Sequence, residues 1–561
     1  MNYLKEYKFQ IITLFLVFTI NKFFQIYLIR NNIFFFYLLF LLLYIFASNI
    51  LINSSKIQKV KKSSNKYKNL LIFLIYLLVD VITQNYYLNF ETITWDTASY
   101  LVASQDISLG YIPFESSWES KGPLIYYIYY FLKLISLNNY VVFRLINDLL
   151  LFVIALIIFS IIYLKNNTYS ISLVSGLFFL GLVSKDWYIS EFTEIYCILI
   201  LSICIYLKEK NSYIYIIPFL LSINSLINQG SILFIFPFFW WIFSRNYKEK
   251  FYKDTKYFLI YLTLPQVIVM SFYYKIGLLK IYLANYITIP INYSGKSEST
   301  LFELLNWLSE FHQYSNLLII ALITIFAVFT FENITFLKKF VNDFYFQCLI
   351  ISILYYFIGS HNFYHHLFYF IFFSCFFIEK IRNIEFKILI TILILLGVSV
   401  VTINTFRTSY NNLIDIEETQ NNYPLYQLSN EIDSFFTNKN YTVLALDYVL
   451  VLNYLEKQNF SYIIHPTNHY EDYIQQPLIE LGVIEVNNIE KLIEQRPDVI
   501  LCNDTLTIRG QLKQFSTITC NDLYSLKGYS RLETGKYQYN WNLDLYKDSS
   551  KNMFVFIKQD S

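Results

Sequence analysis

The sequence predicts an α-helical polytopic membrane protein of about thirteen transmembrane helices, followed by a small C-terminal α/β domain. Three observations support this fold class. The 561 residues are 56% apolar, with a mean hydropathy of +0.42. Apolar runs of about 15 to 24 residues, long enough to cross or nearly cross a bilayer, recur as far as residue 405. From residue 407 the composition becomes polar, and short apolar runs alternate with helical patterns, as in small α/β domains.

The apolar runs delimit the expected membrane helices. The first, 9–28, follows Lys5 and Lys8 and lacks a small-residue cleavage site, so it is predicted to be a retained signal anchor. The 212–244 stretch is also consistent with a re-entrant pair, and several runs need tilt or a thinner bilayer. The remaining runs are 33–53, 69–88, 141–164, 171–187, 192–207, 212–228, 231–244, 257–274, 316–331, 344–359, 363–379 and 386–405.

Basic residues set the expected orientation. They concentrate after the second, sixth, eighth, tenth and twelfth runs, at 56–68, 208–210, 245–253, 338–339 and 380–387. The positive-inside rule places these connections, and the N-terminus, in the cytoplasm. The odd-numbered connections 89–140, 188–191, 275–315 and 360–362 then face outside, together with everything after about residue 406.

This organisation gives three parts. Residues 1–68 hold two helices and a basic cytoplasmic loop, and residues 69–405 form a membrane module whose first outside loop is 89–140. Helices are expected at 97–109 and 123–137 in that loop. Residues 407–561 form the α/β domain, with strands at 442–447, 461–466 and 497–502 and helices between them. That domain has no Gly-rich phosphate loop and no nucleophile elbow, so we expect it to bind a ligand or to brace the membrane module, and not to catalyse.

The composition excludes few classes of function. A net charge of +2 does not favour a nucleic-acid partner, and none is expected. The many Phe and Tyr residues accompany abundant Ile, Asn and Lys, as AT-rich codon usage produces, so they carry no functional inference. Cys502 and Cys520 lie in the polar tail and could pair in an oxidising compartment. No Cys/His spacing resembles a zinc site, and no metal ligand is predicted.

The first outside loop contains the most informative segments, 95–100 (WDTASY) and 110–124 (GYIPFESSWESKGPL). They hold Asp96, Glu115, Glu119 and Lys121, and charge beside a bilayer is costly enough to suggest a site. Asp96 could act as a general base, with a pKa raised by partial desolvation. The alternative is that Asp96 caps a helix beginning near residue 97 or 98.

Further polar groups lie at the outer ends of later runs. Glu191 and Glu194, in the turn 190–194 (SEFTE), could contact a substrate or could be a solvated helix start. Asn228 and Gln229 could line the same cavity. Arg144 is expected to pair with Asp148, and Asp80, deep in the third run, is expected to have an inward-facing polar partner.

Histidines cluster in segment 359–366 (GSHNFYHH). His361, His365 and His366 are suited to hydrogen-bonding a phosphate or a sugar, or to titrating near neutral pH. A divalent metal is the alternative, but no carboxylate is adjacent in sequence to support it. No cofactor is therefore expected to be required.

The loop motif resembles the first extracytoplasmic loop of the GT-C glycosyltransferases, nearest the protein mannosyltransferase and aminoarabinose transferase clan. Bacterial members often show an Asp, a spaced Tyr (here Tyr100) and a run like G-x-x-P-Y-x-D-x-W-D-x-K-P-P-L. Segment 193–194 looks like a second acidic motif of that clan, and 365–366 matches a late His-Tyr pair. The layout over 69–405 is similar, whereas the specific motifs are confined to the first loop.

The resemblance implies a bacterial inner-membrane transferase that uses a polyprenyl-phosphate-linked sugar as donor and a glycan, lipid or protein as acceptor. Asp96 would be the base or the acceptor-orienting carboxylate, Lys121 would lie near the donor phosphate, and Glu194 near the acceptor or donor. Two departures are Ser116, where an Asp is common, and Thr97, where many members have a second acid. They put a two-carboxylate or metal-bridged site in doubt.

Two other functions remain open at this point. A polytopic transporter or lipid flippase would place charge near the midplane, where only Asp80 stands out, and would often show internal repeats, of which none is clear. An O-antigen-type polymerase would be an enzyme with its chemistry in other loops. The sugar, the acceptor and the stereochemical course are not determined by the sequence.

Overall fold

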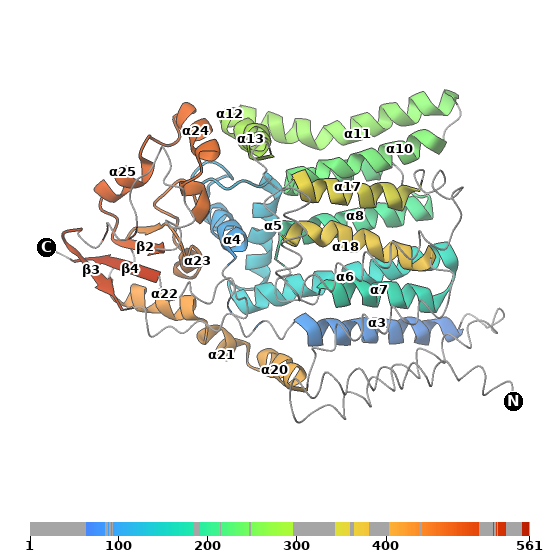
Figure 1. The fold of residues 1–561 in the computed structure, drawn as a ribbon, viewed down its shortest axis with the longest axis horizontal. Helices are drawn as coiled ribbons and strands as arrows, with labels where there is room; N and C mark the ends of the chain where they lie inside the picture. The colour runs from blue at the N-terminus through green and yellow to red at the C-terminus, as the bar shows by residue number, and fades with distance from the viewer. Residues whose placement is uncertain are drawn as a thin grey trace.

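The computed structural model describes residues 63–84, 88, 91, 94–183, 191–213, 215–245, 248–294, 343–358, 364–380, 403–436, 440–503, 520, 523, 526–533 and 553–559. Within these residues the protein is mostly helical with one small sheet, as predicted. Long helices lie side by side at one end of the molecule, and the sheet lies at the other (Figure 1). The predicted runs 9–28, 33–53 and 316–331, and nearly all of 386–405, lie outside the described residues.

The helical bundle is built from the apolar runs. Its members pack because they are apolar on most of their surface, so that each buries one stripe against its neighbours. In α6, for example, Leu151, Ile154, Ala155 and Ile158 recur at helical spacing and are fully buried. The helices are α3 (Ser63–Gln84), α6 (Tyr140–Asn166), α7 (Tyr169–Val183), α8 (Thr193–Lys210), α9 (Ile216–Ile227), η2 (Gln229–Phe234), α10 (Ile235–Arg245), α11 (Lys248–Lys275), α17 (Phe344–Ile358), η4 (Tyr364–Leu367), α18 (Phe368–Ser374) and η5 (Cys375–Lys380).

Two of the described helices are long and apolar enough to cross a membrane, judged by length and composition: Tyr140–Asn166 and Lys253–Lys275. The other apolar helices in the described ranges are shorter, as the sequence suggested. Within the bundle Asp80 is buried, and it interacts electrostatically with the polar side chain of Asp148 on α6.

The first loop, predicted from the sequence to face outside, folds into two helices between the bundle and the sheet, α4 (Trp95–Ser108) and α5 (Pro123–Ile135) (Figure 1). Both lie where the sequence places helices. Pro123 occupies the first position of α5, where its missing N–H costs no hydrogen bond. The connection that follows α11 contains α12 (Leu279–Leu283), a π-helical turn (Ala284–Thr288) and α13 (Ile289–Ser294).

The C-terminal domain has a four-stranded sheet in the order β1-β2-β4-β3, from β1 (Val443–Ala445), β2 (Val499–Asn503), β3 (Tyr529–Leu532) and β4 (Met553–Lys558). β1 and β2 are parallel, and β4 runs antiparallel to β2 and β3. Alternate residues face two cores: Val443, Val499 and Val555 join the core that continues into the bundle, whereas Leu444 and Ile500 join a separate cluster. Cys502 and Cys520 form a disulfide.

The helices of this domain are α20 (Ile403–Ile414), α21 (Ile416–Asn421), α22 (Pro424–Ser434), α23 (Leu450–Leu455), η6 (Pro466–His469), α24 (Asp472–Glu480) and α25 (Asn488–Glu494). The strand predicted at 461–466 is wrong, because this segment does not join the sheet. It forms a single parallel bridge between Ile463 and Trp118 of the first loop. Its apolar side chains are buried against another part of the chain, which local patterning does not distinguish from a sheet.

A buried carboxylate ties the start of the first loop to the C-terminal domain. Glu91 accepts hydrogen bonds from the Leu425 backbone N–H at 2.7 Å and from the Tyr454 hydroxyl at 2.8 Å. Burial raises the pKa of Glu91 to about 8, although these donors and the more distant Arg144 act in the opposite direction. The folded state therefore favours the protonated acid.

We expect the docking of the C-terminal domain to weaken as pH rises. A pKa raised from 4.5 when exposed to about 8 when docked gives stability that is full below pH 4.5 and is lost as pH approaches 8. Thermal unfolding of the purified protein between pH 5 and 9 should show this fall. Glu91→Gln, which stays neutral, should flatten the profile; an unchanged profile in that variant would contradict the role of Glu91.

Candidate functional site

Asp96 lies in the first turn of α4, at the junction of the bundle and the C-terminal domain. The helix begins at Trp95 with Thr94 as its N-cap residue, so the alternative that Asp96 caps the helix is wrong. Instead Asp96 Oδ1 accepts a hydrogen bond from the Tyr100 hydroxyl one turn later, at 3.1 Å. The Asp96 side chain is 30% exposed, whereas the next ten residues of the helix are buried. Of these residues, Asp96 is the one able to meet a molecule from outside.

Positive and polar groups from three other segments converge on Asp96. Burial raises its pKa, but His465, Lys121 and His365, in that order, together with the Tyr100 hydrogen bond, lower the pKa below 3.8. The expectation of a raised pKa is therefore wrong, because desolvation is outweighed by these groups. Asp96 is ionised throughout the physiological pH range.

Glu119 is a second carboxylate of the first loop and is almost fully buried. Its Oε1 accepts hydrogen bonds from the Ser120 backbone N–H at 2.7 Å and the Ser120 hydroxyl at 2.9 Å. Among the described residues Oε2 has no hydrogen-bond partner. Burial raises the pKa of Glu119, against the opposing effect of His465, while the charge of Asp96 adds to the rise. Glu119 thus offers one buried acceptor atom, or a proton, beside Asp96.

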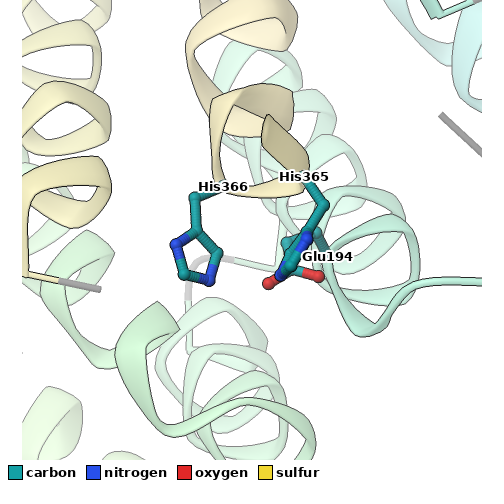
Figure 2. Close-up of side chains that lie close together, drawn as sticks. All are labelled: Glu194, His365 and His366. Atoms are coloured by element: carbon teal, nitrogen blue, oxygen red, sulfur yellow. The ribbon is translucent and has the colours of Figure 1, made fainter. Parts of the chain in front are cut away.

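Glu194, His365 and His366 form a compact cluster (Figure 2). One ligand atom from each lies within 4.8 Å of the others, and all three side chains are buried. Glu194 lies in the first turn of α8, and the two imidazoles come from η4. The histidines thus have a neighbouring carboxylate in space. The sequence did not indicate it, because Glu194 lies far from the histidines along the chain. The donor set suits a divalent cation, and the two imidazoles alone could instead hydrogen-bond a phosphate.

Hydrogen bonds fix the Glu194 carboxylate from several sides. Oε1 accepts from the Asn228 amide at 3.0 Å and the Tyr355 hydroxyl at 2.9 Å, and Oε2 accepts from Thr193 at 3.1 Å. The adjacent Gln229 donates to the backbone carbonyl of Ser120 at 3.0 Å. The junction of α9 and η2 therefore links the Glu194 cluster to the first loop.

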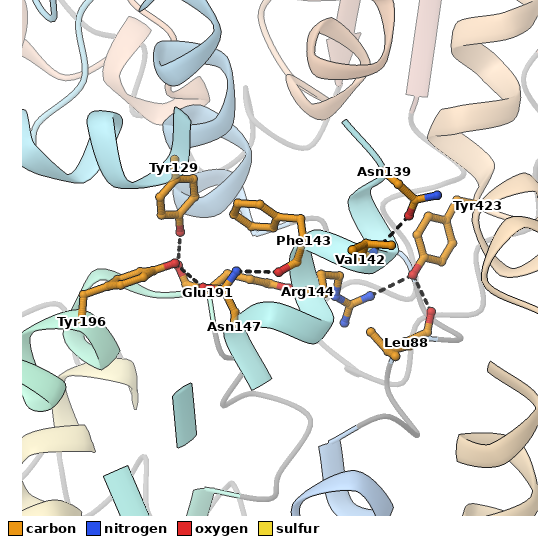
Figure 3. A network of polar contacts seen from close by, with 10 residues as sticks. All are labelled: Leu88, Tyr129, Asn139, Val142, Phe143, Arg144, Asn147, Glu191, Tyr196 and Tyr423. Atoms are coloured by element: carbon orange, nitrogen blue, oxygen red, sulfur yellow. Dashed lines mark hydrogen bonds and ion pairs between the residues drawn. The ribbon is translucent and has the colours of Figure 1, made fainter. Parts of the chain in front are cut away.

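Glu191 belongs to a separate network (Figure 3). Its carboxylate accepts from Arg144 Nε at 2.8 Å, and both side chains are almost completely buried. The Tyr129 hydroxyl donates to the Glu191 backbone carbonyl, and Arg144 also donates to the Tyr423 hydroxyl at 3.2 Å. Asp148 acts on Arg144 electrostatically, but the ion pair that the structure gives is to Glu191. In the described part of the chain, Glu191 thus contacts Arg144 and Tyr129, whereas Asp96 contacts Tyr100 and His465.

The structure thus brings Asp96, Tyr100, Glu119 and Lys121 together with groups from α8, η2 and η4. Lys121 acts electrostatically on Asp96, His365 and His366. The predicted residue His361 lies outside the described residues. The shared site consists of Asp96, Tyr100, Glu119, Lys121, Glu194, Gln229, His365 and His366.

Sequence reasoning missed the contribution of the C-terminal domain. His465 Nε2 lies 3.8 Å from Asp96 Oδ1, and Trp95 Nε1 donates to Asp447 Oδ1 at 2.8 Å. Burial raises the pKa of Asp447 to about 6, although Trp95 and His465 lower it. A single His after an apolar run gives no recognisable motif, so only the fold could reveal it.

Ser116 stands where the resemblance leads one to expect Asp, and the structure supplies a reason. Its hydroxyl donates to Asp106 Oδ2 at 2.7 Å, while Gln458 donates to Asp106 Oδ1 at 3.1 Å. Asp106 is buried, and burial raises its pKa despite these donors. A carboxylate at position 116 would face another carboxylate.

Ser116→Asp should therefore destabilise the first loop by about 1–3 kcal/mol, because it replaces a donor with a like charge beside a buried acid. Ser116→Ala is the matched control, since it removes the hydrogen bond without adding charge. Thermal unfolding at pH 7 should rank wild type above Ser116→Ala and Ser116→Ala above Ser116→Asp. Equal stability of the two variants would contradict the repulsion.

Comparison with protein-family models and with curated proteins finds no match for this chain.

Proposed function

We propose that the protein is an integral membrane glycosyltransferase. It moves a sugar from a polyprenyl-phosphate donor to a glycan, lipid or protein acceptor on the extracytoplasmic face of a bacterial inner membrane. The observation that carries the proposal is the partly exposed Asp96 carboxylate, kept ionised and surrounded by Lys121 and the imidazoles of η4 and the C-terminal domain.

Membrane placement is supported by the outward faces of the bundle. Helix α11 exposes apolar side chains, including Leu259, Leu264, Val267 and Ile268. In the most apolar stretch of Lys253–Lys275 only 17% of the residues are buried inside the protein. A soluble protein rarely leaves so large an apolar patch uncovered. With the basic connections inside, the proposed polytopic arrangement of about thirteen spans puts α4 and the C-terminal domain outside.

The proposed reaction uses the site as follows. An acceptor hydroxyl or amine forms a bond to the anomeric carbon, and its proton passes to Asp96. The bond between that carbon and the phosphate oxygen breaks, and polyprenyl phosphate leaves with the bonding pair. Lys121 and the η4 imidazoles lie where they can stabilise that phosphate. Because the pKa of Asp96 is lowered, the carboxylate is a weak base that first orients the acceptor and takes the proton late.

The site lies at one end of the bundle, which suits a donor with a lipid tail. In this proposal the tail stays among the apolar helices while the sugar phosphate reaches the groups between α4 and η4. A soluble donor would need no such placement. Glu119, with its buried Oε2, and Glu194 are the candidates for hydrogen-bonding sugar or acceptor hydroxyls.

The test is sugar release by the purified protein in lipid nanodiscs from a panel of radiolabelled polyprenyl-phosphate sugars. Transfer or hydrolysis of at least one donor is the expected result. No release from any donor, together with movement of labelled lipid or solute across proteoliposomes, would favour the transporter or flippase. Elongation of a polyprenyl-diphosphate oligosaccharide alone would favour the polymerase.

Turnover is expected not to require a divalent cation. The oxygens of Glu194 already accept three hydrogen bonds, so the carboxylate does not need a metal to be satisfied. Incubation with excess EDTA should leave turnover within about twofold of the untreated enzyme. A large loss that added zinc or manganese restores would instead assign Glu194, His365 and His366 as metal ligands.

A further inference from the structure

The C-terminal domain places one imidazole directly beside the Asp96 carboxylate. His465 Nε2 lies 3.8 Å from Asp96 Oδ1, and the His465 side chain is only 13% exposed. The other ring nitrogen, Nδ1, lies 3.0 Å from the Thr467 hydroxyl. The imidazole therefore has one nitrogen engaged within its own domain and the other directed at the first loop.

Contacts between the two segments fix this juxtaposition. The backbone N–H of Trp118 donates to the backbone carbonyl of Tyr462 at 2.6 Å. The backbone N–H of Ile464 donates to the backbone carbonyl of Trp118 at 3.2 Å. Trp118 is fully buried. The residue just before Asp96, Trp95, meets the His465 ring edge-on, with centroids 6.0 Å apart. Both partners are thus held by backbone pairing and packing, not by flexible side chains alone.

The hydrogen-bond chemistry selects a role for His465. The ionised Asp96 carboxylate favours the tautomer of His465 that carries its proton on Nε2, and the Thr467 hydroxyl can then donate to Nδ1. At 3.8 Å the Nε2–Oδ1 pair is too long for a hydrogen bond without substrate. Catalytic contacts of this kind are often long in a free enzyme and shorten in the complex.

We propose that His465 is a positioning residue for the transferase site: its Nε2–H aligns the Asp96 carboxylate toward the acceptor, so that the C-terminal domain completes the site. This inference depends on the proposed transferase function. The sequence led us to expect a C-terminal domain that only binds or braces. In this proposal the domain instead supplies a residue that positions the reacting carboxylate.

The charged groups around the pair define what a pH profile can report. Asp96 is faced by Lys121 of the first loop, His365 of η4 and Tyr100 of its own helix. His465 acts electrostatically on three further groups, Glu119, Asp447 and His469. Removing His465 takes away the largest of the effects that oppose burial and lower the pKa of Asp96. The acid limb of the activity profile should then move to higher pH.

The kinetic test compares His465→Ala, His465→Gln and Thr467→Val in nanodiscs, with the exposed Glu485→Gln of the same domain as control. His465→Ala should lower kcat about 100-fold with little change in the donor KM, and should raise the acid limb. His465→Gln, which keeps a donor near the Nε2 position, should recover much of kcat, and Thr467→Val should fall between. A wild-type kcat in His465→Ala, or equal losses in both His465 variants with an unmoved acid limb, would overturn the proposal.

A second measurement does not depend on the reaction. The four free cysteines are buried, so an added pair Asp96→Cys/His465→Cys offers the accessible thiols. A short bifunctional methanethiosulfonate should cross-link this pair in membranes, whereas in the control pair Asp96→Cys/Glu485→Cys it should modify the thiols without cross-linking them. Cross-linking without turnover in the wild type would reject the transferase but keep the juxtaposition. No cross-linking would reject the inference whatever the activity.

Discussion

Replacing Asp96 with Asn should lower turnover about 1,000-fold while leaving the protein folded in the membrane. The substitution keeps the size of the side chain and an oxygen that can accept from Tyr100, but it removes the negative charge and the proton acceptor. Single-turnover transfer from the donor that the wild type uses measures the loss. Donor binding should change little, because Lys121 and the η4 imidazoles, not Asp96, are the groups proposed to contact the phosphate.

Asp106→Asn is the matched control, since it is an acid on the same helix that faces Ser116 and Gln458. It should reduce stability modestly and leave the rate of the chemical step near that of the wild type. If Asp96→Asn forms product at the normal rate, Asp96 is not the reacting carboxylate. If both variants lose activity equally, the loss comes from the loop as a whole.

Replacing Arg144 with Met should destabilise the folded protein by about 3–5 kcal/mol, because it leaves the buried Glu191 carboxylate without its cation. Thermal unfolding in detergent and the folded fraction recovered by gel filtration measure this effect. The double variant Arg144→Met/Glu191→Met should recover much of the loss, since it removes both charges together.

This cycle also tests whether Glu191 touches substrate. Any double variant that folds should retain turnover, because Glu191 lies in the network of Arg144 and Tyr423 and not beside Asp96. A stable Arg144→Met with a greatly raised donor KM would contradict the structural role. It would return both residues to the substrate site.

The sequence was sufficient to predict elements whose formation depends on residues close together in the chain. The apolar runs from 69 to 274 and from 344 to 379 coincide with helices, and Pro123 marks the start of α5. The segment 461–466 was misassigned because an apolar run carries no sign of its partner, and here the partner is Trp118. Strands β3 and β4 were missed, since their pairing depends on residues far apart in the sequence.

The candidate site was partly predictable for the same reason. Charged residues beside apolar runs are energetically costly, and this reasoning identified Asp96, Lys121 and Glu194 as candidates. Patterning could not separate Glu191 from Glu194, which lie three residues apart, because the difference depends on Arg144 of α6. The lowered pKa of Asp96 was also beyond reach, since its principal opposing group, His465, comes from another domain.

Accessibility labelling of a cysteine at position 96 tests the central claim most directly. Asp96→Cys should react with a membrane-impermeant maleimide in spheroplasts with intact inner membranes, as should the exposed control Glu485→Cys. Asn211→Cys, in the basic connection after α8, should react only after permeabilisation. Labelling of position 96 solely after permeabilisation would contradict a site that meets a lipid-linked sugar at the outer surface.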